Sequence, residues 1–144
     1  MSSTGRLLKE YNDIKKNIEI NINIKPYEDD LYKWKGFIIG PNGTPYQGKS
    51  FNIECSVPLS YPLSPPKITF VDQIFHPNVY PSNGEICLDI LKNQWTPAWT
   101  ILFSCQAIIV LLTNPEPNSP LNCDAGNFLR SKDYRGFSSI AKFI

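Results

Sequence analysis

The residues best suited to chemistry are concentrated in one segment, 75–100, which reads FHPNVYPSNGEICLDILKNQWTPAWT. It offers a potential nucleophile in Cys87, an amide donor in Asn78 and a carboxylate in Asp89. The segment shows no sustained helical or strand period, and a long irregular segment inside a compact domain is usually functional. We therefore predict an active-site loop with Cys87 as its reactive residue.

Two alternatives for Cys87 stay open. A small cysteine between Ile86 and Leu88 is often buried filler. A Cys-His hydrolase would need a base, and His76, the only histidine in the chain, is followed by Pro77 and has no evident orienting carboxylate. We expect His76 to be a hydrogen-bonded core residue. The loop suits a thiol that receives an acyl group already activated as a thioester better than one that attacks an amide.

The elements that must position this loop are strands followed by helices, the pattern of an α+β fold. Leu7, Tyr11 and Ile14 repeat at helical spacing behind Ser3 and Thr4, either of which could cap a first helix. Strands are predicted at 17–24, 31–39, 51–57 and 67–70, and helices at 101–112, 122–129 and 133–143. The connections between strands are too short for crossover helices, so the sheet is predicted to be an antiparallel meander.

The apolar pattern also predicts which cysteines are buried. Asn17 to Ile24 alternates strictly between polar residues and isoleucine, which is typical of a half-buried strand. Cys55 falls on the apolar face of the third strand, and Cys105 falls on the apolar stripe of the helix 101–112. We expect both thiols to lie in the core.

Composition limits the classes of partner. A chain of 144 residues is the size of one domain, 1–144, and a net charge of +1 gives no general attraction for nucleic acid or anionic lipid. With no Cys-x-x-Cys pair and one histidine, we expect no metal and no cofactor. No secretory leader is evident, and the longest apolar run, 107–112, is far shorter than a membrane span. We expect a cytoplasmic protein with reduced thiols and no direct membrane insertion, recruited to any organelle membrane by a partner.

Three motifs in the loop resemble the catalytic signature of the ubiquitin-conjugating enzymes: His-Pro-Asn at 76–78, Gly-Glu-Ile-Cys-Leu-Asp at 84–89 and Trp-Thr-Pro-Ala at 95–98. With Tyr-Pro-Leu-Ser-Pro-Pro at 61–66, the resemblance runs from Arg6 nearly to the last residue. It implies an N-terminal helix, a four-stranded antiparallel meander, a long catalytic loop and C-terminal helices. It also places a cis peptide bond between Tyr61 and Pro62, which an aromatic residue before proline makes more plausible.

The resemblance implies an activity and its partners. Cys87 would accept ubiquitin, or a ubiquitin-like modifier, as a thioester from an activating enzyme. With a ubiquitin ligase it would pass the modifier to a lysine, or a cysteine, of a protein substrate. Arg6 and Lys9, predicted to lie on the solvent face of the first helix, would dock the activating enzyme. The ligase-binding surface would contain three residues from two loops: Leu63, Pro97 and Ala98.

Within the loop the resemblance leaves roles to be tested. Asn78 could aim its amide N–H at the oxyanion that forms when an amine attacks the thioester, or it could hold the loop that shapes the site. Asp89 could orient the incoming lysine or simply accept a loop hydrogen bond. Ser119 stands where many family members carry a carboxylate, so either the local acid is weaker here or phosphorylation supplies the charge.

Two further features bear on the subclass. The segment between Asn78 and Cys87 is one residue longer than in common members, and together with 120–127 and 135–137 it most resembles the subclass that serves peroxisomal protein import. A catalytically inactive, ubiquitin-binding scaffold of the same fold is the main rival interpretation. The presence of Cys87 argues against it.

Overall fold

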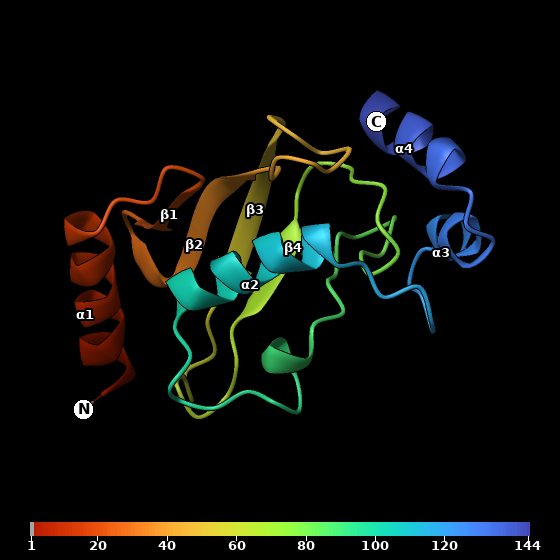
Figure 1. Ribbon diagram of the computed structural model, residues 1–144. Coiled ribbons are helices and arrows are strands. Elements are labelled where there is room, and N and C mark those ends of the chain that lie inside the picture. Colours follow the sequence, from red (N-terminus) through yellow and green to blue (C-terminus); the bar gives the residue numbers. More distant parts are fainter. Residues whose placement is uncertain (1) are drawn as a thin grey trace.

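A four-stranded antiparallel sheet lies at the centre of the computed structural model, which describes residues 2–144 (Figure 1). The strands are β1 (Ile22–Tyr27), β2 (Asp30–Ile39), β3 (Ser50–Ser56) and β4 (Lys67–Phe70). They lie side by side in sequence order, with Trp34 opposite Cys55 and Cys55 opposite Ile68. The predicted meander is confirmed.

The sheet buries one face and exposes the other, because successive side chains of a strand point to opposite sides. In β3, Phe51, Ile53 and Cys55 are buried while Asn52 and Glu54 are exposed. The buried face continues across the other strands and includes Trp34, which has no exposed surface and donates its indole N–H to the carbonyl of Leu31 at 2.8 Å. This face carries the core.

The first predicted strand is wrong over its first half. Only Ile22 and Ile24 are buried, whereas Ile18 and Ile20 are 87% and 92% exposed. Ile22 pairs with Ile38, so two residues earlier Ile20 would need Gly40 as its partner. The backbone of Gly40 is instead bonded to Lys49 and Gly48 of the following turn. β1 therefore begins only where the backbone N–H and C=O groups opposite it are not already bonded to the turn after β2.

The helices are α1 (Ser3–Lys16), α2 (Ile101–Thr113), α3 (Cys123–Arg130) and α4 (Tyr134–Phe143), with a short 3₁₀ turn, η1, at Asp89–Leu91. Each α-helix is capped at its start by a side-chain oxygen. These caps are Ser2, Thr100, Asn122 and Asp133. Ser2, not Ser3 or Thr4, caps α1, because the Ser3 hydroxyl is hydrogen-bonded to that of Tyr32 at 2.7 Å.

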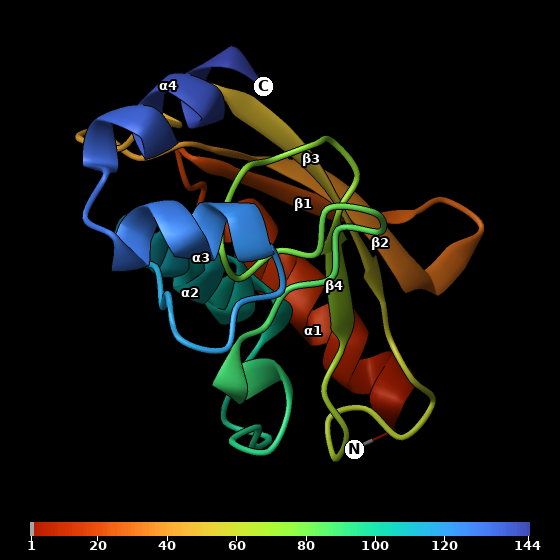
Figure 2. The same cartoon turned by 90° about the vertical axis from the view of Figure 1, so that its right-hand side faces the viewer.

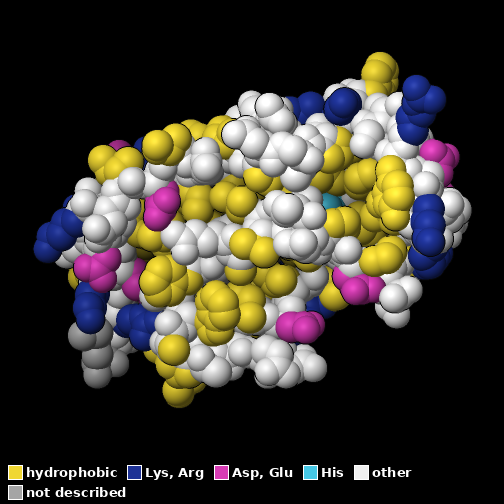
Figure 3. Space-filling view, in the orientation of Figure 1, with side chains coloured by type: hydrophobic (Ala, Val, Ile, Leu, Met, Phe, Trp, Pro, Cys, Tyr) yellow, Lys and Arg dark blue, Asp and Glu magenta, His cyan; other side chains and the backbone are white. Residues whose placement is uncertain are grey.

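The helices surround the sheet unequally (Figures 1 and 2). α2 lies across the buried face of the sheet, α1 stands at the β1 end, and α3 and α4 lie at the opposite end, beside the long loop that follows β4. α2 packs Ile101, Cys105 and Ile108 into the core, whereas Phe103 and Val110 on its outer side are half-exposed. In Figure 3, hydrophobic side chains gather over this central face and basic ones lie mainly toward the two ends.

Within residues 2–144, no helix is both long enough and apolar enough to cross a membrane.

The two cysteines expected in the core are buried. Cys55 and Cys105 each have at most 1% of their surface exposed. Burial raises the pKa of the Cys55 thiol well above its usual value and that of Cys105 to about 12. Both thiols are therefore held protonated and unreactive.

Candidate active site

Cys87 lies at the base of an irregular hairpin that runs from Asn78 to Cys87. The backbone N–H of Cys87 donates to the carbonyl of Asn78 at 2.8 Å, and that of Tyr80 donates to the carbonyl of Glu85 at 2.8 Å. The Cys87 side chain is partly exposed and free of disulfide bonding. The hairpin thus presents a free thiol directly beside the His-Pro-Asn triplet.

Gly84 allows this hairpin to dock on the edge of the sheet. Its φ is +73°, and a Cβ built on it would lie 1.9 Å from the carbonyl oxygen of Phe70 in β4. The N–H of Phe70 donates to the carbonyl of Gly84 at 2.9 Å. Only glycine combines the left-handed backbone with so close an approach, so the position of Cys87 is tied to the sheet.

His76 is buried with both ring nitrogens engaged. Nε2 lies 3.0 Å from the carbonyl oxygen of Leu111, and Nδ1 accepts the backbone N–H of Asn78 at 3.0 Å. Because Nδ1 is an acceptor, the proton lies on Nε2 and is donated to Leu111. Burial lowers the pKa of His76 to about 4, so the ring is neutral at physiological pH. No ring nitrogen is left to activate Cys87, and a Cys-His hydrolase has no base here.

The next two residues hold the connector between α2 and α3, residues 114–122. The carbonyl of Pro77 accepts the N–H groups of Leu121 and Asn122 at 2.8 and 3.1 Å. The Asn78 side chain donates to the carbonyl of Glu116 at 2.9 Å and accepts its N–H at 2.8 Å. Asn78 is only 3% exposed. These contacts fit the loop-holding interpretation of Asn78, while its oxyanion role stays a prediction.

Ser119 and Asp89 both lie at the surface, Ser119 on the connector 114–122 and Asp89 two residues after Cys87. Ser119 is exposed and has a φ of +55°, between the anchored residues Glu116 and Leu121. Asp89 is exposed and begins η1, where its backbone carbonyl accepts the N–H of Lys92 at 3.0 Å. These positions leave two predictions untested: that Asp89 orients the incoming lysine, and that a charge at Ser119 assists the reaction.

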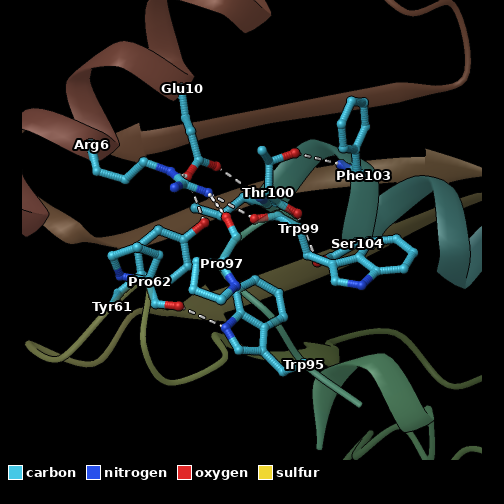
Figure 4. Close-up of polar contacts among 11 residues, drawn as sticks. Arg6, Glu10, Tyr61, Pro62, Trp95, Pro97, Trp99, Thr100, Phe103 and Ser104 are labelled. Atoms are coloured by element: carbon cyan, nitrogen blue, oxygen red, sulfur yellow. Dashed lines mark hydrogen bonds and ion pairs between the residues drawn. The ribbon is translucent and has the colours of Figure 1, made fainter.

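The first helix differs from the sequence prediction at one of the two basic residues, Arg6 and Lys9, that were expected on its solvent face. Lys9 is exposed, as predicted. Arg6 is not free in solvent, because its Nε donates to Glu10 at 2.7 Å and one terminal nitrogen donates to the carbonyls of Pro97 and Trp99, both at 2.8 Å (Figure 4). Its side chain is 21% exposed. The guanidinium is thus part of an internal contact between α1 and the 95–100 loop.

The predicted ligase-facing residues lie on two adjoining loops. Leu63 is 78% exposed, and Pro97 and Ala98 are also exposed. The indole N–H of Trp95 donates to the carbonyl of Pro62 at 2.8 Å, which joins the loops. The peptide bond between Tyr61 and Pro62 is cis, as predicted.

Glu10 is a central residue that sequence reasoning missed. It is 5% exposed, and its Oε2 accepts from Arg6 and from the hydroxyl of Tyr61 at 2.6 Å, while Oε1 accepts the N–H of Ile101 at 2.8 Å. Its spacing of three from Leu7 puts it on the buried face of the helix, and its spacing of four from Arg6 is that of an ion pair. Both signals were present in the sequence.

No metal site accompanies these residues in the part of the chain that the structure describes. No three His, Cys, Asp or Glu side chains there come together in a way that could hold an ion. The chemistry the site offers is that of an accessible thiol beside a rigid, hydrogen-bonded loop.

The structure combines a four-stranded meander, four flanking helices and a partly exposed cysteine beside a His-Pro-Asn loop. Residues 6–144 match the ubiquitin-conjugating enzyme family. The chain belongs to this family. Among its relatives, protein peroxin-4 of Arabidopsis thaliana is 52% identical over 143 residues, 98% of this chain and 91% of that protein. The ubiquitin-conjugating enzyme E2 pex4 of Dictyostelium discoideum is 48% identical over 139 residues, 96% of this chain and 93% of that protein.

A solved structure agrees with the sequence relatives. The ubiquitin-conjugating enzyme Pex4p of H. polymorpha, solved in complex with the soluble domain of Pex22p, superposes with a TM-score of 0.96 at 37% identity, covering 99% of this chain and 96% of that one. The predicted family, fold and peroxin-type resemblance are confirmed. The chain is a ubiquitin-conjugating transferase, and its family implies ubiquitin, an activating enzyme and a ligase as partners.

Proposed function

We propose that Cys87 is the residue that carries ubiquitin. The observation that supports this is its position, partly exposed and bonded through its N–H to Asn78, while Cys55 and Cys105 are buried and protonated. The Cys87 sulfur attacks the carbonyl carbon of the thioester on the activating enzyme. A new C–S bond forms, the old one breaks, and the departing thiolate takes up the proton that Cys87 loses.

In the second step a substrate amine attacks the thioester on Cys87. The C–N bond forms, the C–S bond breaks, and the proton released by the amine returns to the cysteine sulfur. A cysteine acceptor would instead give a new thioester. Charge builds on the carbonyl oxygen before the C–S bond breaks, so a donor such as the Asn78 amide, or a loop that it holds in place, would act here.

The test is charging with activating enzyme, ubiquitin and ATP. We expect an adduct that reductant cleaves, and for Cys87→Ser an oxygen ester that reductant leaves intact. Cys123 is the matched control, because it is the other exposed thiol. Cys123→Ser should charge like the wild type. An adduct that disappears with Cys123→Ser and survives unchanged in Cys87→Ser would overturn the assignment, and parallel reactions with ubiquitin-like modifiers would define the modifier.

We also propose that the chain acts at the peroxisome, as a cytoplasmic enzyme recruited by a membrane-bound partner. Support comes from the names of its relatives and from the H. polymorpha protein solved with the soluble domain of Pex22p. The net charge of +1 gives no reason to add a nucleic acid to the partners.

Recruitment can be tested with a fluorescent fusion of the whole chain in cells of its source organism. We expect signal at peroxisomes that disperses into the cytoplasm when the gene for the Pex22p-like protein is deleted. A fusion that stays dispersed in wild-type cells while remaining competent for charging would contradict the peroxisomal role alone.

A further inference from the structure

One buried carboxylate joins three segments that are distant in sequence. Glu10 of α1 accepts the Tyr61 hydroxyl from the loop before β4, the Ile101 N–H at the start of α2, and Arg6 one turn earlier in its own helix (Figure 4). In residues 2–144 no buried side-chain nitrogen or oxygen lacks a partner, so this cluster is fully satisfied. Removing one partner of a buried ion pair leaves an uncompensated charge, which is costly. A buried polar network whose members are all satisfied is therefore rigid.

Arg6 extends the cluster to a fourth segment, the loop 95–99. Its guanidinium binds three oxygens at once, those of Glu10, Pro97 and Trp99, and lies 5.7 Å from the centre of the Tyr61 ring. The planar, multi-donor guanidinium suits this arrangement, whereas the single ammonium of lysine cannot reproduce it. The contact therefore depends on the shape of arginine and not only on its charge.

Both loops held in this way carry the exposed residues of the predicted ligase surface. Leu63 follows Tyr61 and Pro62, and Ala98 lies between the two carbonyls that Arg6 binds. Trp95 closes the arrangement through its bond to Pro62. The 95–99 loop contains no helix or strand, so these side-chain contacts provide much of what fixes its shape.

We infer that the Arg6–Glu10–Tyr61 network, held inside the protein, sets the geometry of the ligase-facing loops, making Arg6 and Glu10 positioning residues for ligase-stimulated transfer. The inference rests on the ligase role proposed for Leu63, Pro97 and Ala98. On this account the exposed Lys9 serves docking of the activating enzyme, and Arg6 acts through the loops.

The experiment compares Glu10→Gln and Arg6→Lys with Lys9→Ala. For each, thioester formation, discharge to free lysine, and discharge with a purified ubiquitin-ligase domain selected for stimulating the wild type are measured. We expect Glu10→Gln and Arg6→Lys to lower the ratio of stimulated to unstimulated discharge by roughly tenfold, the effect of losing about one good interaction in the complex. Lys9→Ala should slow charging and leave that ratio unchanged. If wild-type charging itself fails, the proposed function is wrong, whereas a normal ratio in both network variants overturns only this inference.

A spectroscopic measurement separates positioning from general destabilisation. The three tryptophans give three indole N–H signals, and we expect those of Trp95 and Trp99 to shift in both network variants while that of Trp34 stays in place. The double variant Arg6→Lys with Glu10→Gln should be no worse than the more affected single variant, because residues of one network are not additive. Should Glu10→Gln fail to fold, Arg6→Lys carries the test by itself. Strictly additive effects, or an unchanged Trp95 signal, would contradict a shared positioning role.

Discussion

Both ends of the Asn78 side-chain amide are engaged with the backbone of Glu116. An amide that donates one hydrogen to the connector still has a second hydrogen, so loop holding and oxyanion stabilisation are compatible. The two roles can be told apart by a second variant, one that removes a different bond to the connector and leaves Asn78 in place. Loop holding is shared with other bonds to the connector, whereas oxyanion stabilisation belongs to this amide alone.

We expect Asn78→Ala to leave charging of Cys87 largely intact and to slow discharge to lysine by about 100-fold or more, because only the amine reaction must stabilise a demanding oxyanion. The measurement is single-turnover charging and discharge, with thermal melts to detect unfolding. Arg130→Ala is the matched control, since it removes a different bond to the connector, that of Arg130 to the carbonyl of Pro117 at 3.1 Å. If both variants slow discharge to lysine equally, Asn78 acts only by holding the loop in place.

Ser119 is the residue at which we expect an added negative charge to influence the site. We expect Ser119→Asp to increase discharge to free lysine by at most about tenfold, since a carboxylate there would help to hold the incoming ammonium before it loses its proton. Aspartate tolerates the left-handed backbone at φ +55° better than most residues. Ser119→Asn matches its shape without the charge and should behave like the wild type. If aspartate and asparagine act alike, the effect is steric and Ser119 does not face the reaction.

The hairpin 78–87 depends on a backbone approach that only its glycine permits. Gly84 and Gly43 both have positive φ, +73° and +81°, but a Cβ at Gly84 would meet the Phe70 carbonyl at 1.9 Å, while nothing lies within 4 Å at Gly43. We expect Gly43→Ala to cost about 1 kcal/mol of folding free energy from backbone strain, and Gly84→Ala roughly 2 to 5 kcal/mol because strand and hairpin must also separate. Urea unfolding of both variants measures this. Equal costs would mean that the hairpin does not rest on β4.

Element boundaries were predictable where local sequence decides them and not where a partner does. β4 and the ends of α2 follow from apolar pattern, Thr100 as a cap and the proline after Asn114. The alternation at 17–24 predicted a strand along its whole length. Pairing between β1 and β2 stops at Gly40, because the backbone N–H of Gly40 donates to the carbonyl of Lys49 instead. The backbone bonds of the turn after β2 decide where β1 begins, and this turn lies twenty or more residues from Ile20, so periodicity alone could not reveal the boundary.

In the candidate site, too, some features were predictable from local sequence and others depend on a partner elsewhere in the chain. The motifs identified Cys87 and the His-Pro-Asn triplet, because chemistry restricts the residue types that can serve there. Arg6 was misplaced for a physical reason: charged residues on a short amphipathic helix are ordinarily solvated, and the acceptors that draw it inward, Pro97 and Trp99, are backbone carbonyls without a sequence signature. The connector contacts of Pro77 and Asn78 are likewise to backbone, and no pattern of residue types marks them.

Across the whole molecule, the buried ring of His76 couples folding to pH. Its folded pKa of about 4 lies below the ordinary value of 6.5, so the unfolded chain takes up a proton first as the pH falls. The stability that the neutral ring contributes is therefore complete above about pH 6.5 and is lost progressively toward pH 4. Between pH 7 and 5, before most carboxylates titrate, the loss should be roughly 2 kcal/mol of unfolding free energy.

We expect the urea midpoint of the wild type to fall over this interval and that of His76→Gln to stay nearly level, starting from a lower value because glutamine cannot reproduce both ring contacts. Because the chain has a single histidine, the ring can also be observed directly in the folded protein. Its carbon-bound proton signals should hardly move between pH 7 and 5, since burial of the ring and the Asn78 N–H that Nδ1 accepts disfavour the charged form. A ring that titrates near pH 6.5 in the folded protein would show that it is solvated, and the rigid link from His76 to the end of α2 would then have to be abandoned along with the pH dependence.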